Sequence, residues 1–387
     1  MSKHILFLGP AGVGKTVFWT MIHALLDKPM RLDYLEPMEI KDLIYRNLRY
    51  GKPLLTYYRA PGGLIKVLNN YTERLFRDRR WPPRTHLREL NEATLYIQFP
   101  MLEYDQNQEL KIVKKERATL FPQDMPGEML SELDELFDRR KVYALGTENI
   151  KKLRKKIVTV LKECLHMYKV QKPNKVSESQ SLVMEVGEME ASKRTTELDN
   201  IRTIKTLIDT VLHPPDVIVI MIRANQVNKF DDKTLGCASR VIPYLLYSMA
   251  LRKEVKYLFL ITAAVADGLI DLNYAHSISK MSINDYFKEI RKIFFTRIAC
   301  NMGALVFPLV NADIPKLNFC GGFIYDASVL VDEIRTPNGL ETRPRFTEEN
   351  KIRSFGLVTF LLYLLSITYS YSFISTTAGE NSQIFIT

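Results

Sequence analysis

The chain has 387 residues, of which 46% are apolar and 25% are charged, a composition that excludes a largely disordered chain. Its length fits one large domain over residues 1–387 that carries insertions. The 54 Lys and Arg residues outnumber the 44 Asp and Glu residues, and the formal net charge of +10 favours anionic partners. Nucleic acid, acidic lipid and acidic protein all stay open, as does an ordinary solvated basic surface.

The first predicted elements are a strand, a glycine-rich loop and a helix. His4 to Leu8 is a short apolar run, GPAGVGKT follows it, and Lys15 to Leu26 has the apolar spacing of a helix. G-x-x-x-x-G-K-T in this context predicts a phosphate-binding loop, because its glycines let backbone N–H groups face phosphate at a helix start. We expect Lys15 to reach the β- and γ-phosphates and Thr16 to bind Mg²⁺. The residues expected at the nucleotide are Gly9, Gly12, Val13, Gly14, Lys15, Thr16 and Val17.

Residues 29–84 are predicted to be a helical insertion that ends in the turn WPPRT. Thr85 in this turn is a candidate for a switch threonine that senses the γ-phosphate through Mg²⁺, and the alternative is a purely structural turn. Arg84 and Arg80 are candidates for a cation that meets the charge developing on the γ-phosphate during hydrolysis. Their alternative is a solvated surface position.

A hairpin is predicted next, followed by a second phosphate-associated motif. Ala93 to Leu102 and Leu110 to Phe121 are β-rich and are separated by the polar connection EYDQNQE. In the following QDMPGEML, Asp124 and Gly127 form D-x-x-G, where the aspartate can hold Mg²⁺ through water and the glycine N–H can meet the γ-phosphate. Glu128 begins a helical pattern and is a candidate for positioning the attacking water, although phosphate would repel its ionised carboxylate.

The second half of the chain is predicted to alternate an insertion with buried strands. Residues 138–213 form a helical and polar insertion, with an amphipathic helix over 149–168 and a polar excursion over 169–200. Three apolar runs are typical of parallel strands covered on both faces. They are PDVIVIMI at 215–222, VKYLFLIT at 255–262 and ALVFPLV at 304–310.

The last apolar segment, residues 354–374, is predicted to be a helix buried against the core. Its Ser, Thr and Tyr content is high for a membrane-spanning helix. The four cysteines are far apart and form no C-x-x-C pair, so they indicate neither a zinc site nor a disulfide framework. The N-terminal sequence also lacks the pattern of a secretion signal. We therefore expect a cytoplasmic protein that does not enter a membrane.

GPAGVGKT, WPPRT and DMPGE, in this order, resemble the TRAFAC GTPases and especially the prokaryotic double-GTPase group. The resemblance implies an α/β fold of the three-layer P-loop NTPase type, with a mostly parallel sheet, one antiparallel strand and helical insertions. It also implies binding of GTP, with ATP possible, together with Mg²⁺. The family's nucleotide and metal positions correspond to Lys15, Thr16, Thr85, Asp124 and Gly127.

The guanine-reading motif of that family, N/T-K-x-D, is only partly matched. The corresponding stretch, Ile261 to Asp267, reads ITAAVAD, so it lacks the lysine and its spacing from Thr262 is longer. Asp267 is the candidate acceptor for guanine N1 and N2, and the alternative is a helix cap. The loop from Val310 to Asp313 is a candidate for flanking the base.

The leading hypothesis is a nucleotide switch or slow GTPase that presents its switch regions to a protein partner. One alternative is a P-loop ATPase that acts on nucleic acid, although PDVIVIMIRAN lacks the acidic end of a Walker B strand. Another is a pseudo-GTPase scaffold that binds nucleotide without turnover. The sequence leaves the oligomeric state open.

Overall fold

A computed structural model of the chain describes residues 3–10, 12–59, 64–82, 95–107, 109–124, 127–145, 149–170, 201, 204–228, 235–250, 253–310, 314, 316–336, 339–369 and 374–376. The polar excursion predicted at 169–200 lies outside these residues except for 169 and 170, which end a helix.

A mixed sheet of eight strands forms the centre of the described structure. Its strand order is β12-β4-β5-β1-β6-β7-β8, with β3 paired to β4. The strands are β1 (Lys3–Leu8), β3 (Thr56–Tyr57), β4 (Leu95–Tyr104), β5 (Leu110–Asp124), β6 (Val217–Arg223), β7 (Val255–Thr262), β8 (Leu317–Tyr325) and β12 (Ile374–Thr376). The pairings β5–β1, β1–β6, β6–β7 and β7–β8 are parallel, which confirms an α/β fold.

The prediction of one antiparallel strand is incomplete. Strand β4 pairs antiparallel with β5, as the hairpin pattern predicts, but β12 pairs parallel with β4 and so also runs against the core strands. This short strand lies beyond the apolar C-terminal helix. Its pairing with β4 is a contact between distant segments that local pattern does not reveal.

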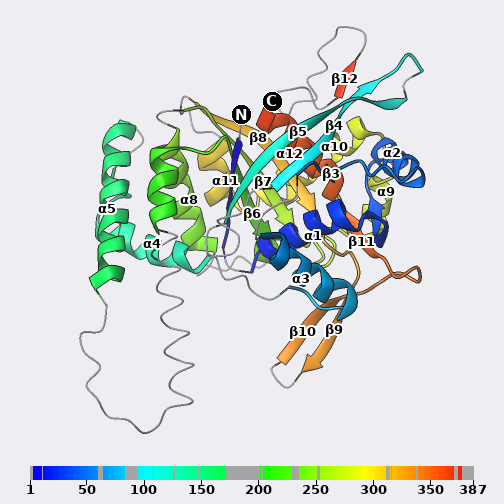
Figure 1. Ribbon diagram of the computed structural model, residues 1–387. Helices are drawn as coiled ribbons and strands as arrows, with labels where there is room; N and C mark the ends of the chain where they lie inside the picture. Colours follow the sequence, from blue (N-terminus) through cyan, green and yellow to red (C-terminus); the bar gives the residue numbers. More distant parts are fainter. Residues whose placement is uncertain are drawn as a thin grey trace.

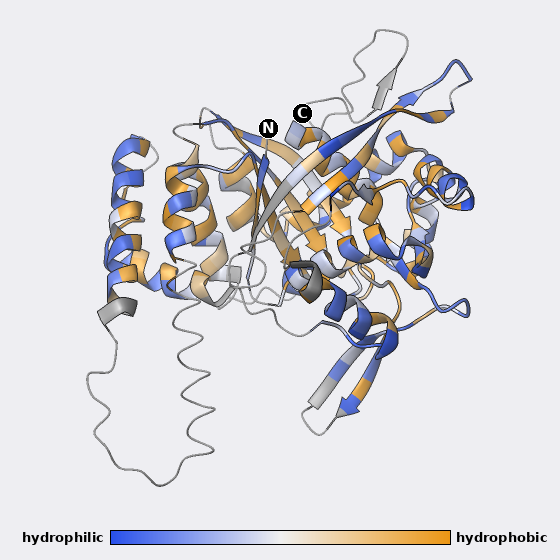
Figure 2. Cartoon of the chain, viewed as in Figure 1, coloured by the Kyte–Doolittle hydropathy of each residue, from blue (hydrophilic) through white to orange (hydrophobic). Residues whose placement is uncertain are grey.

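Helices cover both faces of the sheet (Figure 1). Those of the first face include α1 (Lys15–Asp27), α3 (Leu64–Arg77) and α12 (Leu357–Tyr369), with Phe18 of α1 and Phe360 of α12 in ring contact at 5.7 Å. Those grouped on the other side are α4 (Gly127–Arg139), α5 (Ile150–Val170), α8 (Leu235–Met249) and α11 (Gly303–Val310). Figure 2 shows that apolar residues concentrate on the central strands between these helices.

The last strand of the sheet differs from the prediction. Residues 304–310, expected to be a strand, form helix α11, and β8 supplies the strand instead. A short continuous apolar run fits a strand or a buried helix equally well, so its pattern alone did not decide. The two glycines of β8 weaken its strand pattern in the sequence. At Gly322 a Cβ atom would overlap the ring of Phe294, so glycine is needed for close packing there.

The predicted helical insertion at 29–84 contains strands as well as helices. It includes η1 (Pro29–Arg31), β2 (Leu32–Leu35) and α2 (Met38–Arg49), in addition to β3 and α3. Strand β2 pairs in parallel with β11 (Ile352–Phe355), which directly precedes α12. The insertion and the C-terminal segment are therefore in direct contact through a shared two-stranded sheet.

The apolar segment predicted at 354–374 is a buried helix over a shorter range, α12. Two of its buried hydroxyls are bonded within the helix, because Ser366 donates to the Tyr363 carbonyl at 2.7 Å and Thr368 donates to the Leu364 carbonyl at 2.5 Å. The Thr359 and Tyr363 hydroxyls donate outside it, to the Glu36 carboxylate at 2.7 Å and the Cys320 carbonyl at 2.6 Å. Among the described residues, no single helix is long and apolar enough to cross a membrane. One bent pair, Ile283–Ala299 with Gly303–Val310, reaches that length and composition when its two parts are taken together.

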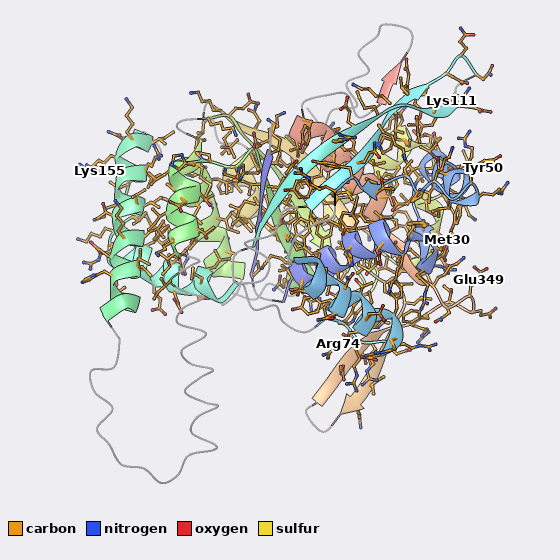
Figure 3. All side chains as sticks on the ribbon, viewed as in Figure 1. Met30, Tyr50, Arg74, Lys111, Lys155 and Glu349 are labelled. Atoms are coloured by element: carbon orange, nitrogen blue, oxygen red, sulfur yellow. The ribbon has the colours of Figure 1, made fainter. Side chains whose placement is uncertain are left out.

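The helices of the predicted 138–213 insertion are present, since α5 is amphipathic and residues 204–212 are helical. Figure 3 shows Lys155 pointing outward from α5. The remaining elements are α7 (Ala224–Asn228), α9 (Leu272–Ile278), α10 (Ile283–Ile293), η3 (Phe294–Ala299) and the antiparallel hairpin of β9 (Val331–Thr336) and β10 (Gly339–Pro344).

Candidate functional site

The candidate site lies at the carboxyl end of β1, where the chain changes direction across the sheet. From β1 the chain moves to β5 on one side, and then crosses to β6 on the other side. Ligands of α/β proteins bind in the crevice that such a reversal leaves at the carboxyl ends of the strands. The loop GPAGVGKT occupies this position, between the end of β1 and the start of α1.

The glycines of this loop meet identifiable backbone requirements. Gly12 and Gly14 have φ values of 77° and 87°, in the left-handed region that side chains other than glycine rarely adopt. A Cβ atom at Gly9 would overlap the carbonyl oxygen of Met221 in β6. Gly14 is the N-cap of α1, with no side-chain cap and no acidic residue in the first helical turn, so the helix start is suited to an anion.

The loop lysine is held inside the loop. Nζ of Lys15 donates to the carbonyl oxygens of Gly9 at 3.1 Å and Pro10 at 3.4 Å, and the residue is only 8% exposed. Thr16 is half-buried in the first turn of α1, and its carbonyl accepts a hydrogen bond from the Thr20 hydroxyl at 2.9 Å. This arrangement places the lysine cation and the threonine at the helix start, where a phosphate chain would lie.

A cavity of about 240 Å³ opens beside the loop. Its walls come from the loops that follow β1, β7 and β8, and from the β9–β10 hairpin, which lies below the start of α1 in Figure 1. Its apolar lining includes Trp81, Val13 and Val17, and its acidic and basic lining residues are Arg223, Asp267, Asp326 and Glu333. An apolar cavity with a few convergent polar groups is the usual form of a small-molecule site.

A buried hydrogen bond joins the glycine loop to the loop after β7. The Thr262 hydroxyl donates to the Val13 carbonyl at 2.7 Å, and Thr262 is only 3% exposed. The next residue, Ala263, has φ 55° and also lines the cavity. A non-glycine residue in the left-handed region is strained, and such strain occurs often at functional sites.

Asp326 joins the loops that follow β7 and β8. Its carboxylate accepts hydrogen bonds from the backbone N–H groups of Val265 and Ala266, both at 2.9 Å, and from that of Ser328 at 3.2 Å. Burial raises the pKa of Asp326 from 3.8 to about 7, against the lowering effect of these hydrogen bonds. Asp326 therefore fixes the shape of the cavity wall.

Asp267, the candidate acceptor for the base, lines the cavity, and its carboxylate has protein partners. Nε of Arg223 donates to Oδ2 at 2.8 Å, Nη2 of Arg223 donates to Oδ1 at 3.0 Å, and the backbone N–H of Asn225 donates to Oδ2 at 3.2 Å. The N-cap of the following helix, α9, is Asp271, which accepts from the Tyr274 N–H at 2.7 Å. Asp267 instead accepts from an N–H in the first turn of α7, so the helix-capping alternative is met at α7.

The D-x-x-G residues are brought to the same end of the sheet by their backbone. Asp124 ends β5 opposite Phe7 of β1, and Gly127 and Glu128 begin α4. The side chains of Asp124 and Glu128 lie outside the described part of the structure, as do residues 83–94 with Arg84 and Thr85. Within the described residues, no group of three or more His, Cys, Asp or Glu side chains could hold a metal ion.

The strand expected before the loop from Val310 to Asp313 is not present, and the base-flanking role of that loop stays a prediction. That stretch follows helix α11 and not a strand, and residues 311–313 lie outside the described range. The loop after the last core strand is instead Asp326 to Ser328, which lines the cavity. The apolar run FIY directly before Asp326 could have predicted a strand that ends at this loop.

Three other cavity residues were also missed. Trp81 was considered only as part of a turn, Arg223 was given no role beyond the predicted strand at 215–222, and the hydroxyl of Thr262 had no predicted partner. No protein-family model matches the chain, and a search of curated proteins finds no match.

Proposed function

We propose that this chain binds a purine nucleoside triphosphate with Mg²⁺ and acts as a nucleotide-dependent switch or slow GTPase on a P-loop NTPase fold. The observation that carries the proposal is the continuous site at the carboxyl ends of β1, β7 and β8. There, a glycine loop at a helix start adjoins a cavity with apolar walls and a charged end.

The phosphates are assigned to the loop and the first turn of α1. Backbone N–H groups and the helix dipole favour negative charge at this position, and Lys15 adds a cation. Phosphate oxygens would replace the Gly9 and Pro10 carbonyls as acceptors for Nζ of Lys15. Thr16 is the side chain proposed to hold Mg²⁺ on the phosphates, with Thr85 and Asp124 completing its surroundings.

The base is assigned to the cavity. Trp81 offers an aromatic face to a planar ring, and Val13 and Val17 offer apolar contact. The Thr262–Val13 hydrogen bond supports the assignment, since it keeps the phosphate loop and the base cavity in one rigid arrangement.

The switch is assigned to the segments that adjoin the γ-phosphate. The end of β5 lies beside the end of β1, so Asp124 and Gly127 are close in the fold to the phosphate loop. A triphosphate that draws Thr85 and Gly127 inward would present a different surface to a protein partner than a diphosphate does. Hydrolysis would draw on Glu128 to position water and on Arg84 to meet the developing charge.

The test is equilibrium binding of fluorescent GTP and ATP analogues, with Mg²⁺, to the wild-type chain and to Lys15→Ala. We expect at least a tenfold loss of affinity in the variant without loss of the fold, because Lys15 neutralises phosphate charge. The matched control is Lys288→Ala, since the Lys288 side chain is 78% exposed in α10. Equal affinity in wild type and Lys15→Ala would contradict the phosphate-loop assignment.

Turnover is measured on the same samples by release of phosphate. Binding of triphosphate with hydrolysis that exceeds the Lys15→Ala background identifies a slow hydrolase. Binding without such hydrolysis identifies a pseudo-GTPase scaffold.

A further inference from the structure

We propose that Arg223, oriented by Asp267, recognises the base through the O6 and N7 acceptors of guanine. The inference rests on the proposed nucleotide site and names the group that selects the base within it. In this arrangement Arg223 is the specificity-determining residue, and Asp267 is the positioning residue.

The guanidinium of Arg223 has one edge held by the protein and another edge available. Asp267 occupies the edge formed by Nε and Nη2. Within the described residues, Nη1 of Arg223 makes no hydrogen bond, and the side chain is 35% exposed at the wall of the cavity. Because a guanidinium carries five N–H donors in a planar fork, the edge formed by Nη1 and Nη2 can still donate two parallel hydrogen bonds.

The carboxylate of Asp267 is poorly placed to read the base by itself. Its Oδ2 already accepts from Arg223 and from the Asn225 N–H, and its Oδ1 accepts from Arg223. Guanine N1–H and N2–H would require an acceptor from each oxygen, so one of the two donors at Oδ2, Arg223 or the Asn225 N–H, would have to be displaced. The ion pair is mostly buried on the Asp267 side, which is 11% exposed, and a buried bidentate pair is expensive to break.

Arg223 also supplies a positive charge at the cavity in place of the lysine that ITAAVAD lacks. The position after Thr262 is Ala263, which brings no charge to the cavity. A cation reaches the cavity from the neighbouring strand instead, because β6 and β7 pair in parallel with Arg223 opposite Thr262. The charged element of this wall is thus built across two strands.

The fork of an arginine discriminates between purines by chemistry. Guanine presents two acceptors, O6 and N7, on one edge, whereas adenine presents the N7 acceptor beside the N6 amino donor. Adenine would therefore leave one guanidinium N–H facing another donor. A bidentate contact of this kind corresponds to a preference of roughly 5- to 150-fold.

Nucleotide analogues test this reading in the wild-type chain, without any substitution. Competition against a fluorescent GTP analogue is measured for GTP, inosine triphosphate, 7-deaza-GTP and ATP, all with Mg²⁺. Inosine triphosphate keeps O6 and N7 but lacks the 2-amino group, and we expect it to bind within about threefold of GTP. We expect 7-deaza-GTP, which lacks the N7 acceptor, and ATP to bind at least about fivefold more weakly than GTP.

Arg223→Lys adds a second measurement, because lysine keeps the charge and loses the fork. We expect the variant to bind GTP and ATP with nearly equal affinity while it keeps its affinity for the triphosphate group. The control is Arg353→Lys, which alters another partly buried Arg–Asp pair, with Asp33, between β11 and β2.

The opposite result in the analogue series would overturn the inference. If inosine triphosphate binds much more weakly than GTP while 7-deaza-GTP binds equally well, Asp267 reads N1 and N2 and Arg223 does not read the base. If all four triphosphates bind equally, the phosphate site stands but the cavity does not select guanine. If none of them binds, the nucleotide site itself is wrong.

Discussion

Replacing Thr262 by valine removes one buried hydroxyl and leaves the volume of the side chain almost unchanged. The hydroxyl donates to the Val13 carbonyl at 2.7 Å, and both residues are buried, with Thr262 3% and Val13 1% exposed. It is the hydrogen bond that ties the proposed phosphate loop to the proposed base loop.

The expected effect follows from the group that the substitution leaves behind. An unsatisfied buried acceptor lowers the free energy of unfolding by about 1–3 kcal/mol. The Val13 carbonyl can regain a hydrogen-bond partner if the glycine loop moves away from residue 262. The loop would then adopt conformations that hold phosphate less well. If binding requires the original conformation, triphosphate affinity falls by up to the same free energy, roughly 5- to 150-fold.

Two measurements separate the effect on binding from the effect on stability. Urea unfolding reports the free energy of unfolding, and titration with a fluorescent GTP analogue reports affinity. Thr368→Val is the matched control, because its buried hydroxyl donates to the Leu364 carbonyl within α12, away from the cavity. Thr262→Ser, which keeps the hydroxyl, should retain most of the affinity.

If the Thr262–Val13 hydrogen bond organises the site, Thr262→Val should lose affinity for the triphosphate, whereas Thr368→Val should lose only free energy of unfolding. If both variants bind the nucleotide as tightly as the wild type, the Thr262 hydrogen bond does not organise the site. The reasoning that links the two loops would then be refuted.

Three further substitutions test other parts of the structure. Gly9→Ala should lower the free energy of unfolding by about 1–3 kcal/mol in urea titration, because its methyl group overlaps the Met221 carbonyl; full stability would contradict the close approach. Thr85→Ala should weaken binding of triphosphate but spare diphosphate in parallel titrations, and equal losses would show a structural role. Burial raises the pKa of Glu36 from 4.5 to about 7. Between these pH values the folded chain therefore keeps a proton that the unfolded chain has already lost. As the pH rises from 4.5 to about 7, the free energy of unfolding should fall by about 3 kcal/mol. Glu36→Gln should remove this fall in urea titrations across pH, whereas Glu349→Gln, at a 73% exposed side chain, should retain it.

The strand, glycine loop and helix start proposed to bind phosphate could be predicted because their conformation is set locally. The conformations of Gly12 and Gly14, the helix start and the position of Lys15 all depend on residues within a few positions of one another. The β4–β5 hairpin, α5 and the buried α12 were likewise predicted from apolar periodicity and a short polar turn.

The cavity could not be predicted in this way, because its contacts join distant parts of the chain. Thr262 and Val13 are 249 positions apart, and Arg223 and Asp267 are 44 positions apart. Asp267 was identified from its place after a strand, but its partner on β6 depends on the parallel pairing of β6 with β7. The local sequence predicts that a side chain follows a strand. Which side chain it contacts depends on which strands are neighbours in the sheet.

The last strand shows the same division. The run ALVFPLV is apolar enough for a strand or a buried helix, and β8, with two glycines, has a weak strand pattern. Tertiary packing places β8, and not residues 304–310, as the strand next to β7. Gly322 lets β8 approach the ring of Phe294 closely in this position. The sequence by itself thus determined the loop that the proposal assigns to phosphate, and only the tertiary structure decided which side chains surround the cavity proposed for the base, since burial and strand pairing are properties of the whole chain.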